Sequence, residues 1–387
     1  MSALALTLRG AEVLWPDGPG AGDLHLAGGI ITQTPAAQVV DLSGFLILPG
    51  IVDLHGDGFE RHLAPRRGAM KDLDQGLIAA EAELAANGIT TAILAQFFSW
   101  EGGLRGADFA ERVFAALAQV RAMVATDLRA QLRLELSLCE DFARAEEMVA
   151  RHDIGYVVFN DHLPHDALAA GKRPQGLTGQ ALRIGRNPEK HLETLLALHA
   201  GMDRVAPALD ALSARLIARG VRLGCHDERT PQDRQAARAR GIAIAEFPET
   251  QAAAEAARAG GDAVIMGAPN LVRGGSHKGN ASAFEMVALG LVDALASDYH
   301  YPSLKRAAFL LADTGLCDLA TAWALISSHP ARILDLSDRG ALRPGARADL
   351  VVLEAESRRV MATLAAGRMS YLAGEAATRF LGASRVQ

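Results

Sequence analysis

Short apolar runs alternate with longer amphipathic stretches through the middle of the chain. Stretches of helical period include residues 72–88, 107–125 and 230–241. Between such stretches lie eight apolar runs, each of a length that suits one buried strand. The runs occupy residues 50–55, 88–98, 131–139, 154–162, 220–228, 241–250, 262–270 and 291–300. Eight strands that alternate with helices predict an α/β fold of the (β/α)8 TIM-type barrel class.

An open doubly wound sheet is the alternative arrangement of alternating strands and helices. That fold favours a glycine-rich phosphate-binding turn after its first strand. Here the first run is followed by "HGDGFERHL", which places charged side chains where that turn would be. The sequence therefore favours the barrel.

Both ends of the chain have a different pattern, in which short alternating runs are separated by Gly and Pro. This pattern is typical of antiparallel strands joined by turns. It covers the start of the chain up to Gly50 and recurs in 339–356 and 360–374. We expect residues 1–50 and 340–387 to form one small β-sandwich domain, and residues 51–339 to form the barrel.

Polar side chains of the metal-binding types recur at or near the ends of the predicted barrel strands. The residues are His55, Asp57, Glu135, Asp161, His162, His226, Asp227, Glu228, Glu246 and Asp298. In a barrel, the carboxyl ends of the strands meet at one mouth. Burial of so many carboxylates together is unfavourable unless cations offset their repulsion. The pattern therefore predicts a metal site.

A single histidine at a strand end is more often a hydrogen-bonded structural residue, so the metal prediction depends on the coincidence of several strands. Five other histidines fall in predicted loops or helices, and we interpret them as surface residues. They are His25, His152, His165, His191 and His199.

Imidazole and carboxylate ligands together suit zinc, with manganese or iron as alternatives. Three histidines and three carboxylates are enough for two ions if one carboxylate bridges them. Two such ions lower the pKa of a shared water. Asp298, after the last strand, is the candidate to ligate one ion and to accept the proton of the attacking water.

A loop of small and basic residues, "GAPNLVRGGSHKGNAS" (267–282), follows the seventh strand. Small residues let backbone N–H groups approach an anion, and barrels often bind phosphate in this region. The candidate substrate-binding residues are Arg273, Gly275, Ser276, His277 and Lys278. Arg61, Arg66 and Arg67 are either a second cationic wall or surface residues.

Charge and cysteine content narrow the function class. The net charge of −6 argues against a nucleic-acid partner. Three scattered cysteines, no signal peptide and no long apolar run predict a cytoplasmic protein that is not in a membrane. Barrels of this size often pair, so we expect a homodimer.

Five motifs resemble those of one known family. They are "LPGIVDLHGD", "AEFPET", "MGAPNLVRGGSHKGN", "SDYHYPSL" and "GALRPGARADLVVLE". The chain resembles the amidohydrolase superfamily and, within it, the PhnM-type members of the carbon–phosphorus lyase pathway. The resemblance implies a metal-dependent barrel flanked by a β-sandwich. It also implies hydrolysis of α-D-ribose 1-methylphosphonate 5-triphosphate to the 5-phosphate and pyrophosphate.

The resemblance also implies which residues hold the metals. The implied ligands are His55, Asp57, Glu135, His162, His226 and Asp298. Glu135 is the candidate bridging ligand, and Glu246 is an alternative to one of the histidines. Departures from the family pattern occur at Gly58 and after His162, where residues 164–190 are expected to form a mobile lid.

Two other functions stay open at this point. The first is a C–N hydrolase, a deacetylase or cyclic amidase acting on a phosphorylated or other anionic small molecule. The metal ligands alone do not separate this from phosphoanhydride hydrolysis, although the anion loop favours phosphate. The second is a non-catalytic binding subunit, which the presence of Asp298 argues against.

Overall fold

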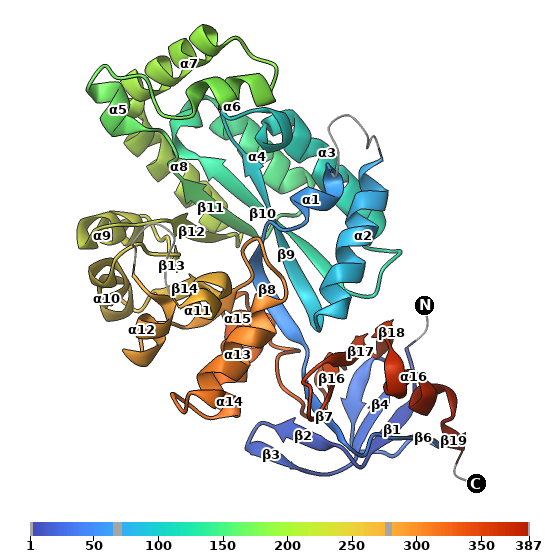
Figure 1. Ribbon diagram of the computed structural model, residues 1–387. Coiled ribbons are helices and arrows are strands. Elements are labelled where there is room, and N and C mark those ends of the chain that lie inside the picture. The colour runs from blue at the N-terminus through green and yellow to red at the C-terminus, as the bar shows by residue number, and fades with distance from the viewer. Residues whose placement is uncertain (1–2, 65–71, 275–280, 386–387) are drawn as a thin grey trace. The chain divides into compact units, whose positions relative to one another are not determined.

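The computed structural model describes residues 3–64, 72–274 and 281–385 (Figure 1). Within these ranges, eight strands form one sheet in the order β15-β14-β13-β12-β11-β10-β9-β8. They are β8 (Ile51–Gly56), β9 (Ile89–Phe98), β10 (Asp127–Glu135), β11 (Tyr156–Asn160), β12 (Arg222–His226), β13 (Ile244–Glu246), β14 (Ala263–Gly267) and β15 (Ala294–Ala296). Neighbouring strands run parallel wherever their register is resolved. The predicted barrel strands are therefore confirmed.

The sheet closes on itself between its first and last strands. A parallel bridge joins Gly56 to Asp298, just beyond β15. The N–H of Asp298 donates to the carbonyl of His55 at 3.0 Å, and the N–H of Asp57 donates to the carbonyl of Asp298 at 2.9 Å. Closure removes the exposed edges that an open sheet would have.

Helices connect the strands, as the amphipathic stretches predict. They are α1 (Glu60–Leu63), α2 (Leu73–Ala86), α3 (Ala107–Val120), α4 (Phe142–Arg151), α5 (His165–Ala169), α6 (Leu177–Arg183), α7 (Pro188–Ala200), α8 (Val205–Ala218), α9 (Pro231–Ala239), α10 (Gln251–Ala259), α11 (Ala268–Arg273), α12 (Ala283–Ala288), α13 (Ser303–Asp313), α14 (Leu319–Ala324), α15 (Ser328–Ile333) and α16 (Gly374–Leu381). Short 3-10 helices cover Gly103–Arg105, Leu136–Asp141 and Met202–Arg204. Capping residues define where several helices begin. Thr230 and Asp233, for example, form a capping box at the start of α9, in the turn after β12.

The third barrel strand differs from its predicted range, 131–139. It begins at Asp127 and ends at Glu135, and a 3-10 helix follows directly. Glu135 is therefore the last residue of its strand, where it reaches the carboxyl end of the sheet.

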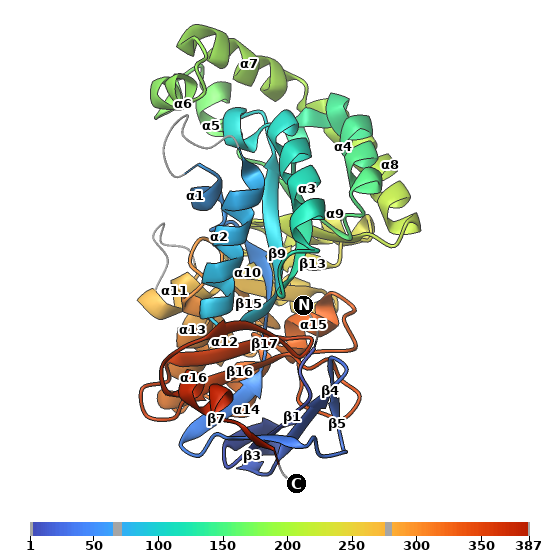
Figure 2. The same cartoon turned by 90° about the vertical axis from the view of Figure 1, so that its right-hand side faces the viewer.

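Strands from both ends of the chain pair in two further sheets, as predicted. The orders are β19-β6-β1-β4-β5 and β18-β17-β16-β7-β2-β3. The strands are β1 (Leu6–Arg9), β2 (Glu12–Trp15), β3 (Gly18–Ala21), β4 (Leu24–Ala27), β5 (Ile30–Thr32), β6 (Gln38–Asp41), β7 (Phe45–Pro49), β16 (Leu350–Glu354), β17 (Val360–Ala365), β18 (Arg368–Leu372) and β19 (Ser384–Arg385). Strands from both ends of the chain lie together in these sheets (Figure 2). Strand β7 pairs antiparallel with β16, with Leu48 opposite Val351.

An apolar cluster forms the core of these terminal sheets. It includes Leu8 and Leu26 from the start of the chain, and Leu350 and Leu364 from its end, all of them fully buried. Because the two ends share one core, neither end alone has a partner for its apolar face.

The chain forms two compact units. One comprises residues 1–94, 117–129 and 265–387, and the other comprises residues 95–116 and 130–264. The predicted domain boundaries, near residues 50 and 340, stay a prediction. In the described part of the chain, no helix has the length and the apolar run that crossing a bilayer requires.

Residues 164–190 are expected to form a lid loop, but the structure places helices there. Helices α5 and α6 lie in this segment, and α7 begins with the cap Asn187 and Pro188 (Figure 1). A local apolar core holds them: Trp100, Leu163, Leu168, Leu177 and Leu195. The loop prediction is wrong because Pro164, Gly176 and Pro188 stand at the starts of short helices here.

The surface interpretation of His191 is also wrong. Its side chain is fully buried, between Arg186 and Gln180, with both contacts at 3.2 Å. Burial and the Arg186 charge lower its pKa. Its position on a helix gave no sign of this burial, because the burial comes from the packing of the neighbouring short helices.

The carboxylate of Asp127 ties β10 to the C-terminal part of the chain. It accepts hydrogen bonds from Arg129 at 3.0 Å, Arg339 at 2.6 Å and Arg347 at 3.2 Å. Burial alone would raise the pKa of Asp127, but Arg129 and Arg339 outweigh it and lower that pKa to about 2.

Asp127→Asn is expected to lower the free energy of unfolding at pH 7 by about 2 kcal/mol or more, because a shift from 3.8 to about 2 carries about that much. The folded-state pKa is depressed, so this stabilisation is present above pH 4 and is lost as the pH falls toward 2. Urea unfolding at pH 7, 5 and 3 measures it. The difference in free energy of unfolding between the wild type and the variant should be about 1 kcal/mol smaller at pH 3 than at pH 7. Glu356→Gln, an exposed carboxylate, is the control, and an advantage independent of pH would contradict the prediction.

Candidate metal centres

The first group of candidate ligands is His55, Asp57 and Asp298. Each offers a donor atom, and the three atoms lie within 4.8 Å of one another. His55 and Asp57 come from the end of β8, and Asp298 follows β15. The two backbone hydrogen bonds that close the sheet also join these three residues, so barrel closure itself sets their spacing.

The backbone at Asp298 has an unusual conformation. Its φ is +54°, in the left-handed region that few residues other than Gly, Asn and Asp adopt. Such conformations often occur at functional sites, where the surrounding structure holds them. Here the adjacent Ser297 supplies that support: its N–H and hydroxyl donate to the buried carboxylate of Asp53 at 3.0 and 2.5 Å. The carboxylate of Asp53 thus positions both strand ends, a role that the sequence analysis did not find.

Two glycines make the close packing at this strand end possible. A Cβ on Gly56 would lie 2.7 Å from Asp53 Oδ2, and a Cβ on Gly58 would lie 2.9 Å from Arg61 Nη1 and 3.1 Å from the carbonyl of Tyr299. The departure from the family pattern at Gly58 therefore has a local cause. The space that a larger side chain would need is filled by Arg61 and the backbone of Tyr299.

The second group is His162, His226 and Asp227, again with donor atoms within 4.8 Å of one another. His226 ends β12, and His162 lies just beyond β11. Asp227 also adopts a left-handed conformation, with φ of +60°, and its N–H donates to the carbonyl of Glu246 at 3.0 Å. Asp227 lies at a predicted strand end but is not among the predicted ligands.

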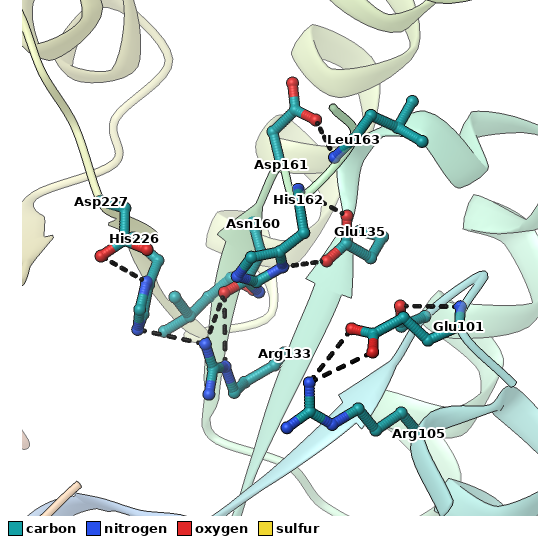
Figure 3. A network of polar contacts seen from close by, with 12 residues as sticks. Glu101, Arg105, Arg133, Glu135, Asn160, Asp161, His162, Leu163, His226 and Asp227 are labelled. Atoms are coloured by element: carbon teal, nitrogen blue, oxygen red, sulfur yellow. Dashed lines mark hydrogen bonds and ion pairs between the residues drawn. The ribbon is translucent and has the colours of Figure 1, made fainter. Parts of the chain in front are cut away.

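Glu135 contacts His162 in two ways. Its carboxylate bonds the Nδ1 of the ring and accepts the backbone N–H of His162 at 3.2 Å (Figure 3). A carboxylate on one ring nitrogen orients a histidine so that the other nitrogen faces a metal. The carboxylate of Glu135 thus orients His162, while its role as a bridging ligand stays a prediction.

Glu246 is fully buried at the end of β13. Its Oε1 accepts hydrogen bonds from the hydroxyl of Tyr156 at 2.6 Å and from Gln131 at 2.8 Å. Its role as a metal ligand also stays a prediction. Asp161 bonds His165 at 2.9 Å, and Glu228 forms an ion pair with Arg234 at 3.0 Å, so each has a partner outside the second group.

Arg133 is a site residue that the sequence analysis missed. It lies on β10, two residues before Glu135, and its guanidinium contacts His226 and Asn160 (Figure 3). Alternate residues of a strand share a face, so Gln131, Arg133 and Glu135 point the same way while Leu132 and Leu134 point the other. This alternation was the signal in the sequence that could have identified Arg133.

The predicted anion loop is only partly described. Gly275, Ser276, His277 and Lys278 lie outside the described residues, as do Arg66 and Arg67. Arg273, at the end of α11, donates to the hydroxyl of Tyr299 at 2.6 Å.

Arg61 approaches the same tyrosine from α1 and donates to its carbonyl at 3.1 Å. Tyr299 directly follows Asp298, so both guanidinium groups contact the residue next to a candidate ligand. Arg61 also pairs with Glu83, which offsets part of its charge.

Each group fits a divalent transition metal. Zinc binds histidine and carboxylate at about 2.0–2.2 Å, so ligands of one ion lie about 3–4 Å apart. Donor atoms within 4.8 Å of one another approach that spacing. Mixed imidazole and carboxylate donors also suit manganese and iron.

A known protein family matches most of this chain. The model of the amidohydrolase family matches residues 62–376. The chain belongs to the amidohydrolase family. It is 34% identical to the alpha-D-ribose 1-methylphosphonate 5-triphosphate diphosphatase of Escherichia coli (strain K12). The match extends over 345 residues and covers 86% of this chain and 90% of that protein. This amidohydrolase is therefore an enzyme, a hydrolase.

Solved structures of the same fold are much less similar in sequence. The N-acetylglucosamine-6-phosphate deacetylase of Pasteurella multocida matches 95% of this chain and 99% of its own, with a TM-score of 0.63 and 11% identity. The N-acyl-D-glutamate deacylase of Bordetella bronchiseptica, solved with zinc and a phosphonate inhibitor, has a TM-score of 0.59 and 15% identity over 95% of this chain and 97% of its own. These likenesses support the barrel fold of this amidohydrolase and carry no inference about its substrate.

Proposed function

We propose that this amidohydrolase hydrolyses α-D-ribose 1-methylphosphonate 5-triphosphate to the 5-phosphate and pyrophosphate. The observation that carries the proposal is the 34% identity to the diphosphatase of that substrate, which extends over most of both chains. The ligand groups at the strand ends support it, because hydrolysis of this kind needs an activated water.

We propose that two zinc ions are the cofactor, with manganese or iron as alternatives. The first group, His55, Asp57 and Asp298, and the second group, His162, His226 and Asp227, are the residues that would hold them. Such cations, when bound, lower the pKa of a ligated water and neutralise charge on phosphoryl oxygens. That one carboxylate bridges the two ions stays a prediction.

Asp298 is the proposed proton acceptor. Its carboxylate takes a proton from the attacking water, and the water oxygen forms a new bond to the α-phosphorus. The bond from the α-phosphorus to the oxygen that bridges it to the β-phosphorus breaks. Pyrophosphate leaves with that oxygen and with the electron pair of the broken bond. The backbone hydrogen bonds from Asp298 to His55 and from Asp57 to Asp298 keep Asp298 next to the other two residues of the first group.

The two positive side chains that contact Tyr299 support an anionic substrate. Arg61 and Arg273 both contact Tyr299, which is 46% exposed and directly follows Asp298. Guanidinium groups bind phosphoryl oxygens in a fork geometry, so this pair is the proposed contact for the polyphosphate tail. Gly275, Ser276, His277 and Lys278 stay predicted contacts.

The test is pyrophosphate release from the ribosyl triphosphate, with metal analysis of the same sample. We expect stoichiometric pyrophosphate and 5-phosphate, and no comparable turnover on an amide panel of N-acetyl sugars, N-acyl amino acids and cyclic amides. Turnover of an amide with no pyrophosphate release would instead support the C–N hydrolase. Binding of the triphosphate without turnover, in protein that holds its metal, would support a non-catalytic subunit.

We further propose a cytoplasmic homodimer. All three cysteines, Cys139, Cys225 and Cys317, are free thiols, which suits a reducing compartment. Light scattering on purified protein measures the oligomeric state, and a monomer would contradict the dimer.

A further inference from the structure

Arg133 is a charged side chain inside the barrel sheet. Only 4% of its surface is exposed. On the same face of β10, Gln131 bonds Glu246 and Glu135 bonds His162. Arg133 therefore occupies the middle of a polar row that positions the residues at the neighbouring strand ends.

The guanidinium of Arg133 is held from several sides (Figure 3). Its Nη2 lies 3.1 Å from His226 Nε2 and 3.2 Å from Asn160 Oδ1, and its Nε lies 3.3 Å from the same amide oxygen. Its central carbon lies 3.9 Å from the centre of the Phe97 ring, within range of a cation–π contact.

These contacts define the hydrogen-bonding role of each ring nitrogen of His226. An arginine side chain keeps its charge in proteins and only donates, so Nε2 of His226 is the acceptor of that hydrogen bond. The proton of the neutral ring then lies on Nδ1, which is 3.1 Å from Asp227 Oδ1. In this tautomer the free lone pair of the ring, through which His226 would bind a metal ion, is the one that Arg133 contacts.

We propose that Arg133 competes with a divalent cation for Nε2 of His226 and thereby weakens metal binding by that imidazole. The competition has two parts. The guanidinium occupies the lone pair, and its positive charge repels a second cation in a partly buried site. The inference rests on the proposed metal-dependent function.

A purely structural role for Arg133 predicts the opposite effect. If its contacts with Phe97 and Asn160 only hold the strand ends in place, removing it would disorder His226 and weaken metal binding. If it competes with the metal, removing it strengthens binding. The sign of the change in metal affinity therefore separates the two roles.

The experiment is a Zn²⁺ titration of metal-free protein against a chromophoric chelator. Arg133→Met keeps an apolar side chain over Phe97 and removes the charge. We expect it to bind one Zn²⁺ at least tenfold more tightly than the wild type. Arg133→Lys keeps the charge as a single compact donor and should show a smaller gain. Arg144→Met, which removes an exposed arginine paired with Asp108, is the control and should change nothing.

A double-mutant cycle assigns the effect to the ring of His226. In a His226→Asn background, Arg133→Met should no longer tighten Zn²⁺ binding. Unchanged or weaker binding by Arg133→Met with native circular dichroism, or a gain that persists without His226, would overturn the inference. If Arg133→Met does not fold, Arg133→Lys decides by the same criterion. A wild type that binds no Zn²⁺ would instead overturn the proposed metal-dependent function, so the two failures are distinct.

Discussion

Asp298→Asn is expected to lower kcat for pyrophosphate release by about 1,000-fold, within the range that a positioned general base contributes. Asn has the same shape but cannot accept a proton from water. It also tolerates the left-handed backbone that this position requires, since φ is +54° here. The backbone hydrogen bonds to His55 and Asp57 do not involve the substituted atoms. The variant should therefore fold normally and lose the chemical step.

The matched control is Asp313→Asn, the same substitution at an exposed aspartate that pairs with Arg358. It should keep the wild-type kcat. Steady-state kinetics of pyrophosphate release and thermal melting of both variants measure the contrast. If Asp298→Asn turned over at close to the wild-type rate, its role as proton acceptor would be refuted.

Loss of a candidate ligand is the second large effect. His55→Asn and His162→Asn each remove an imidazole from a different group. Each variant is expected to lose up to one metal ion per chain after dialysis and to lose at least 100-fold in kcat, because a carboxamide is a much poorer ligand than imidazole for these metals. Elemental analysis and the pyrophosphate assay on the same samples measure both effects.

His152→Asn is the control for these variants, because His152 pairs with Glu111 and belongs to neither group. It should keep the wild-type metal content. Full metal retention in both ligand variants would show that the two groups are not the metal sites. Loss in only one variant would identify the group that holds the metal and would reject the other.

Local patterns in the sequence predict the carboxyl ends of the first and fifth barrel strands well. The buried run of β8 stops at His55, and that of β12 stops at His226, because a polar side chain after an apolar run marks the end of a buried strand. The alternation along β10 runs to Glu135 and stops there, although the apolar run continues to Cys139. The sequence alone misjudged that boundary, because a short 3-10 turn has no distinct pattern of its own.

The partner of each polar side chain was much harder to predict. Asp227 and Glu228 are neighbours in the chain, yet Asp227 contacts His226 and Glu228 contacts the buried Arg234. Arg133 was invisible as a site residue, because its contact with His226 joins residues 93 positions apart. Likewise the role of Asp53 depends on Ser297, which lies 244 positions away along the chain.

The sequence by itself determined the alternation of strands and helices, the pairing of the two chain ends and the ligand types at the strand ends. Each of these features follows from the hydrophobic periodicity and the composition of short segments, which determine where the backbone is buried and where it is exposed to solvent. Only the tertiary structure decided that Asp298 closes the sheet against His55, that Glu135 orients His162 and that Arg133 contacts Nε2 of His226. Such contacts depend on side-chain direction and distance across strands, and no local pattern encodes them.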